Sequence, residues 1–148
     1  MHKPPILVSA CLAGIYCRYN GETGSVVAIL DLIREGRALP FCPEAYGGLP
    51  TPRLPCEIQG NHVMDSEGND RTDEFRRGAE EGLRLARLAG CTDAILKARS
   101  PSCGKGVIYD GTFSSTRIPG NGVFADLLLA NNIAVHSEED MDELLSRR

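Results

Sequence analysis

The sequence predicts an α/β fold in which helices flank a mainly parallel, doubly wound (Rossmann-like) sheet of about four strands. Short apolar runs of strand length alternate with segments whose apolar residues recur at helical spacing. Uninterrupted apolar runs are typical of parallel strands that are buried on both faces, and their alternation with helices indicates a doubly wound sheet. A chain of 148 residues without repeats or linkers is expected to form one domain over residues 1–148.

The first third of the chain places a helix between two strands. Residues 5–10 are the first predicted strand, and the polar segment Cys11–Thr23 is predicted to be a loop. Apolar residues then recur on one helical face, and Gly36 is the predicted end of that helix. Residues 37–42 are the second predicted strand.

The middle of the chain begins with a loop and ends with the longest helix. Four prolines and a glycine pair make residues 43–56 a structured loop, and residues 57–64 are predicted to form a small hairpin. Residues 65–70 are a turn-rich connection. The helix is predicted over residues 72–89, with Thr72 as its N-terminal cap.

The last third contains two further strands. Residues 92–98 are the third predicted strand, and residues 107–113 suggest an extended piece and a turn. A helix is predicted over residues 122–130 and a fourth strand over residues 133–135. Ser137–Asp140 resembles a capping box before a final short helix.

Composition narrows the classes of partner. The chain has 16 basic and 20 acidic residues and a net charge of −4. A broad nucleic-acid-binding surface needs an excess of positive charge, so this composition argues against one. No run approaches the roughly 18 apolar residues of a membrane helix, and Met1–Pro5 has no signal-peptide pattern. We therefore expect a cytoplasmic protein, without a membrane or nucleic-acid partner, whose six cysteines are reduced.

Three cysteines follow predicted strands. Cys11, Cys42 and Cys103 each come just after an apolar run, and ligands bind beyond the carboxyl ends of parallel strands. These thiols are therefore predicted to converge at one edge of the sheet. Three thiolates suit zinc with an open fourth position, or three irons of a 4Fe-4S cluster whose fourth iron is open to substrate. Sequence pattern alone does not choose the metal.

The other cysteines are interpreted differently. Cys91 should lie at the amino end of the third strand, and Cys56 has no convergent partner, so both are predicted to be structural. Cys17 is undecided because it lies six residues after Cys11 in a loop that can fold back over the site. The histidines show no metal-ligand spacing and are interpreted as structural or surface residues, namely His2, His62 and His136.

Polar residues accompany the three thiols. Glu44, two residues after Cys42, is either a general acid or base or a cap or ion-pair partner of its loop. The turn Ser100–Gly106 has backbone N–H groups that can bind an anion or a substrate oxygen, which makes Ser102 and Gly104 candidate substrate-binding residues. Its spacing is not that of a P-loop. This edge also carries positive charge, from Lys97, Arg99 and Lys105.

Long motifs in this chain resemble a bacterial family formerly catalogued as a domain of unknown function, whose best-understood relatives are thiouracil desulfidases. The resemblance covers nearly the whole chain. The motifs are ILVSACLAG (6–14), CRYNG (17–21), CPEAYGGLPTPR (42–53), LKARSPSCG (96–104) and IYDGTF (108–113).

The resemblance implies a 4Fe-4S cluster held by Cys11, Cys42 and Cys103, the same thiols that follow the strands. It implies an open iron that takes sulfur from a thiolated uracil, assisted by Glu44 and Ser100 as catalytic residues. We therefore expect a non-redox desulfidase acting on a thiolated uracil-type base or a similar small thiocarbonyl compound. The alternatives are a non-catalytic iron–sulfur or zinc module, and a cluster-free domain that binds a small molecule or anion.

Overall fold

The computed structural model describes residues 3–21 and 24–147. Part of the predicted loop (Glu22 and Thr23), two residues of the N-terminal segment (Met1 and His2) and Arg148 lie outside the described residues. The strands are β1 (Ile6–Ser9), β2 (Ala38–Phe41), β3 (Cys56–Gln59), β4 (His62–Asp65), β5 (Asp93–Leu96), β6 (Val107–Tyr109), β7 (Arg117–Pro119) and β8 (Ala134–Ser137). The helices are the 3₁₀ turn η1 (Ala10–Ala13), α1 (Val27–Arg34), α2 (Pro43–Tyr46), α3 (Thr72–Ala89), α4 (Val123–Ala130) and α5 (Met141–Ser146).

The predicted α/β fold is confirmed. Four parallel strands form one sheet in the order β2-β1-β5-β8. From β1 the chain continues to β2, which lies on one side of the central β1–β5 pair. From β5 it continues to β8, which lies on the other side of that pair. The strand order therefore reverses between β1 and β5, and a crevice at their carboxyl ends is where such a sheet binds its ligand.

Alternate residues of the strands belong to two apolar cores, one on each face of the sheet. Leu7 packs with residues of α3 and α4 in the first core. Ile6 and Val8 pack with residues of α1 and α5 in the second. All three side chains are fully buried, which explains why the first strand reads as a continuous apolar run rather than an alternating one.

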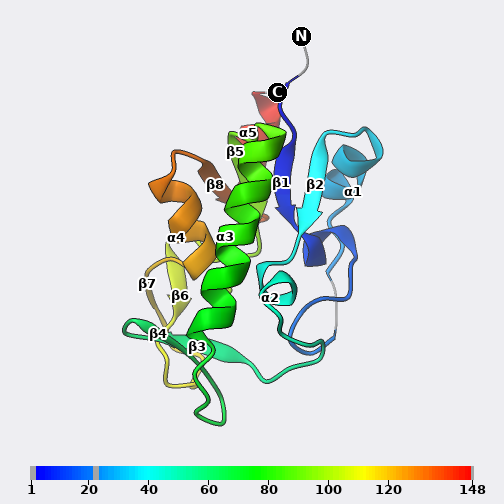
Figure 1. Ribbon diagram of the computed structural model, residues 1–148. Coiled ribbons are helices and arrows are strands. Elements are labelled where there is room, and N and C mark those ends of the chain that lie inside the picture. The colour runs from blue at the N-terminus through cyan, green and yellow to red at the C-terminus, as the bar shows by residue number, and fades with distance from the viewer. Residues whose placement is uncertain (1–2, 22–23, 148) are drawn as a thin grey trace.

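Two antiparallel hairpins lie beyond the carboxyl ends of the parallel strands (Figure 1). One pairs β3 with β4 and agrees with the predicted hairpin. The other pairs β6 with β7, a strand that the sequence did not predict. No helix in the described part of the chain is long and apolar enough to cross a bilayer.

Three local predictions were wrong. The loop after Cys42 begins with a helical turn, because Pro43 occupies the first helical position, where its fixed φ is favourable and its missing N–H costs nothing. The predicted loop from Cys11 begins inside η1. Thr72 does not cap α3: its hydroxyl accepts a hydrogen bond from the Val63 backbone instead, at 2.9 Å.

The capping box at Ser137–Asp140 forms only in part. The Asp140 carboxylate accepts a hydrogen bond from the Ser137 N–H at 2.7 Å, as a capping box requires. The Ser137 hydroxyl, however, accepts the N–H of Glu139 at 3.0 Å and not the N–H of Asp140. As a result α5 begins at Met141, after a turn.

The contact of α2 with α3 depends on a glycine. A Cβ at Gly78 would lie 1.7 Å from the Pro43 carbonyl oxygen, which belongs to the backbone of α2. Helix propensity alone would make Gly78→Ala stabilising by about 1 kcal/mol. We instead expect a net loss of stability of about 1–3 kcal/mol, the usual cost of overpacking, in urea unfolding. Arg76→Ala, on the exposed side of α3, is the control, and a Gly78→Ala protein as stable as wild type would contradict this packing.

Candidate active site

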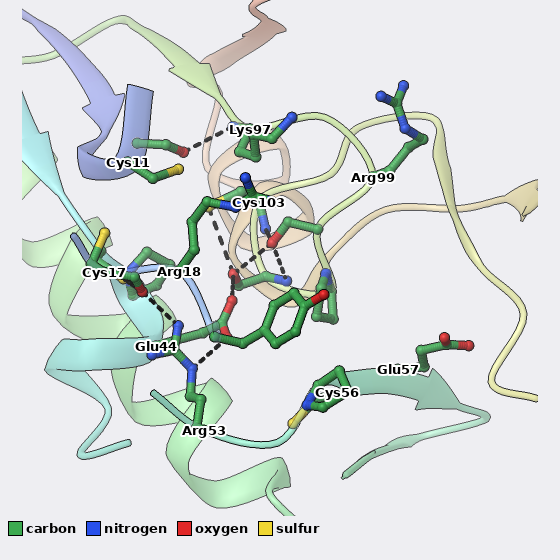
Figure 2. Close-up of a pocket in the computed structure, with 18 of the residues that line it drawn as sticks. Cys11, Cys17, Arg18, Glu44, Arg53, Cys56, Glu57, Lys97, Arg99 and Cys103 are labelled. Carbon is green, nitrogen blue, oxygen red and sulfur yellow. Dashed lines mark hydrogen bonds and ion pairs between the residues drawn. The ribbon is translucent and has the colours of Figure 1, made fainter. Parts of the chain in front are cut away.

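A cavity of about 560 Å³ lies at the carboxyl ends of the parallel strands. Its walls come from the segments that follow β1, β2 and β5, and from residues of both hairpins. Figure 2 shows Cys11 and Lys97 on the strand side and Cys56 and Glu57 across the cavity, on the hairpin side. The cavity thus occupies the crevice that the strand order predicts.

The three predicted thiols all reach this cavity. Cys11 lies in η1 directly after β1, Cys42 follows β2, and Cys103 lies in the turn after β5. Cys11 and Cys103 are buried and Cys42 is half-buried. Parallel strands that end together deliver their next residues to one place, although these cysteines are far apart in sequence.

Cys17 joins the same group of thiols. It is buried, lines the cavity and shares hydrogen bonds with the thiols of both Cys11 and Cys42. These bonds lower the pKa of Cys11 and lower the pKa of Cys42 to about 7, whereas they raise that of Cys17. Burial raises the pKa of the Cys103 thiol. Cys11 and Cys42 are thus the thiols most readily ionised in this group.

Glu44 is held on both carboxylate oxygens. Arg53 Nε donates to Oε1 at 3.1 Å, and the Ser102 hydroxyl donates to Oε2 at 2.8 Å. Ser100 contacts Ser102 and not Glu44 in the hydrogen bonds of this site. Its hydroxyl lies 3.0 Å from that of Ser102 and accepts the backbone N–H groups of Ser102 and Cys103. The turn after β5 therefore positions the serine that touches Glu44 and places Cys103 next to it.

Comparisons with known proteins agree with this geometry. Residues 6–140 match the 2-thiouracil desulfurase family. The chain belongs to this family. A solved structure of a [4Fe-4S]-dependent thiouracil desulfidase, TudS, is 48% identical, with a TM-score of 0.94 over 98% of this chain and 97% of that one. The uncharacterised protein YbbK of Bacillus subtilis (strain 168) is 41% identical over 150 residues, 95% of this chain and 99% of that protein. The resemblance drawn from the motifs is confirmed.

The cavity of this 2-thiouracil desulfurase family member also carries positive charge. Lys97 and Arg18 both act on Cys11 and lower the pKa of its thiol, although less than the bond from Cys17 does. Lys97 pairs with Glu138 at 2.6 Å and Arg99 with Glu139 at 3.0 Å. Each pair joins the segment after β5 to the segment after β8, so the ion pairs also brace the wall of the cavity.

The structure brings together some predicted residues and separates others. Ser102 faces the cavity, but Gly104 does not line it, and the Gly104 N–H donates to the Ser100 carbonyl. Lys105 lies outside the cavity lining. Cys91 belongs to the core under α3 and α4, as predicted. Cys56 was expected to lack convergent partners, yet it lines the same cavity, with its pKa raised to about 12 by burial.

The two described histidines lie away from the cavity lining. His62 pairs with Asp70 at the surface, and His136 lies 3.7 Å from Asp93. These positions agree with structural or surface roles, and His2 lies outside the described residues.

Arg53 is the main site residue that the sequence analysis missed. Its side chain is only 6% exposed and donates to Glu44, to the Cys17 carbonyl at 2.8 Å, and to Pro50 and Thr51. It thus joins the segments that carry Cys17 and Glu44. The signal available in the sequence was its place at the end of the CPEAYGGLPTPR motif.

Removing Arg53 should destabilise the protein strongly. Breaking one partner of a buried ion pair costs about 3–5 kcal/mol because the other charge stays buried, and Glu44 is only 14% exposed. We expect Arg53→Met to lose about 3 kcal/mol in urea unfolding, and Arg53→Lys to recover little because lysine lacks the planar fork. Arg34→Met removes an exposed pair and is the control. Equal losses in Arg34→Met and Arg53→Met would rule out this role.

Proposed function

We propose that this chain is a 4Fe-4S-dependent desulfidase that replaces the sulfur of a thiolated uracil-type base by oxygen, within a single domain, with the cluster held by Cys11, Cys42 and Cys103. The observation that carries the proposal is the meeting of these three thiols with the Glu44–Ser102 pair in one cavity at the switch point of the sheet.

The residues present fit such a cluster. None of the six cysteines is in a disulfide, and soft thiolates are the usual ligands of iron–sulfur clusters. No three His, Cys, Asp or Glu side chains among residues 3–21 and 24–147 gather around one point as the ligands of a single metal ion do. A cluster instead binds each cysteine through a different iron, so its ligands need to surround a volume. Lys97 and Arg18 would balance the negative charge that the thiolates bring.

When bound, the cluster would supply an open iron that acts as a Lewis acid toward the sulfur of the thiocarbonyl. The side chains of the protein would carry out the proton transfers. The overall exchange is C=S plus water giving C=O plus hydrogen sulfide, which moves protons but no net electrons. Glu44 is placed to take a proton from the attacking water and to return one to the departing sulfur.

The neighbours of Glu44 explain why it is suited to that role. Arg53 fixes Oε1 and leaves Oε2 to the Ser102 hydroxyl. That hydroxyl can pass a hydrogen bond between Glu44 and a bound ligand, and Ser100 orients it from behind. Arg53 itself is fixed by three further acceptors, so the carboxylate has little freedom to turn away from the cavity.

The test begins with anaerobic purification followed by iron and sulfide analysis, and then with 2-thiouracil as substrate. We expect about four irons per chain and release of uracil and sulfide in equal amounts. A full cluster without turnover of thiolated bases would favour a non-catalytic module. Protein without iron or acid-labile sulfide would favour the cluster-free binding domain.

A further inference from the structure

The turn between β6 and β7 holds an aromatic side chain at the cavity. Phe113 lies in this turn, lines the cavity and is half-buried. Its neighbours in the turn are hydroxyl residues, and it belongs to neither apolar core. The ring–ring contacts within the described residues join Phe41 to Tyr46 and to Phe124. Packing in the core therefore does not account for the position of Phe113.

Several residues that line the cavity have an unfavourable backbone conformation. Four non-glycine residues in the described ranges have left-handed φ angles. Three of them line the cavity: Arg99 at 64°, Phe113 at 59° and Ser115 at 62°. Conformations of this kind persist only where the surroundings enforce them, and they gather at ligand sites.

Strand β3 holds the turn at Phe113 through side-chain hydrogen bonds. Glu57 Oε1 accepts the N–H of Gly111 at 3.0 Å and that of Phe113 at 3.2 Å. Gln59 donates to the Gly111 carbonyl at 2.7 Å. Gly111 permits the close approach, because a Cβ there would lie 2.7 Å from the Ile58 carbonyl oxygen. The first hairpin thus clamps the second at the point where Phe113 meets the cavity.

We infer that Phe113 is the stacking surface for the substrate ring and that Glu57 is the positioning residue that presents it. The site then selects planar, unsaturated thiolated heterocycles over saturated or open-chain thiocarbonyl compounds. This inference rests on the proposed function and specifies its substrate class. The physical basis is that an aromatic face gains more from a flat π-system than from a puckered ring of the same size.

The experiment measures binding of two unreactive probes to the anaerobically prepared protein by titration calorimetry. Uracil is planar, and 5,6-dihydrouracil has the same polar groups on a puckered ring. Stacking of one base is worth about 1–3 kcal/mol by truncation of the aromatic side chain. We therefore expect Phe113→Leu to weaken uracil binding about tenfold and to leave dihydrouracil binding nearly unchanged.

Further variants separate stacking from general damage. Phe113→Trp should retain uracil binding, and Glu57→Ala should lose as much as Phe113→Leu while remaining folded by circular dichroism. Ile118→Leu, on exposed β7 outside the cavity lining, is the matched control. Equal loss of both probes in Phe113→Leu, undiminished uracil binding, or no uracil binding by wild type would each overturn the inference. Uracil binding with this selectivity but without desulfuration would refute the proposed function alone.

Discussion

Serine in place of Cys11, Cys42 or Cys103 is expected to give a colourless protein from anaerobic preparations. Each thiolate would bind its own iron, and a hydroxyl is a poor substitute for a soft thiolate. Iron and acid-labile sulfide should fall to background in each variant. The fold should persist, because two apolar cores made mainly of aliphatic side chains hold the two faces of the sheet, unlike a zinc finger, which unfolds without its metal. Iron analysis with circular dichroism measures both effects.

Cys56→Ser is the matched control for this experiment, because Cys56 lines the same cavity and is outside the proposed ligand set. It should keep its cluster, as should Cys91→Ser in the core. A full complement of iron in any one of the three ligand variants would remove that residue from the set. Cys17 would then take its place, since it already contacts the thiols of Cys11 and Cys42.

Glu44→Gln is expected to keep the cluster and to lose about 10²–10⁴-fold in turnover, the usual contribution of a general acid or base. The amide has the size of the carboxylate and can still accept the Ser102 hydroxyl, but it cannot carry the proton. The measurement is turnover of 2-thiouracil per mole of intact cluster, for wild type and variant.

Stability has to be followed in the same samples, because Glu44→Gln leaves Arg53 buried without its counter-charge. The variant should therefore also melt at a lower temperature than wild type. A carboxylate that only braces its loop would give that lower melting temperature with unchanged turnover per cluster, and this result would end the case for Glu44 as the catalytic acid or base.

Several features of the site could be predicted because they follow from local pattern. The helix over residues 72–89 was predicted with its observed bounds, since its apolar face and the glycine after it are both local signals. The arrival of Cys11, Cys42 and Cys103 at one cavity follows from a rule about parallel strands and needs only the strand ends. The central strands were located to within about two residues for the same reason.

Other features depend on how loops fold against one another. The β6–β7 pairing joins a predicted extended piece to Arg117–Pro119, a three-residue strand that is wholly exposed. Because an exposed strand buries no face, its sequence carries no apolar pattern from which it could be predicted. From the sequence alone, the Thr72 hydroxyl is expected to cap its own helix. In the structure the hairpin places the Val63 N–H next to this hydroxyl, which accepts a hydrogen bond from it instead. Tertiary contacts of this kind override a local propensity.

The sequence by itself determined the α/β class, the three strand-end cysteines, Glu44 beside Cys42 and membership of the 2-thiouracil desulfurase family. These properties are carried by short-range patterns and contiguous motifs. Only the tertiary structure decided that Cys17 joins Cys11 and Cys42, that Ser102 rather than Ser100 touches Glu44, that Arg53 holds both Glu44 and the Cys17 backbone, and that Glu57 accepts the Phe113 N–H. Each of these contacts depends on how separate segments of the chain lie against one another, which is set by the three-dimensional course of the chain and which no periodic pattern encodes.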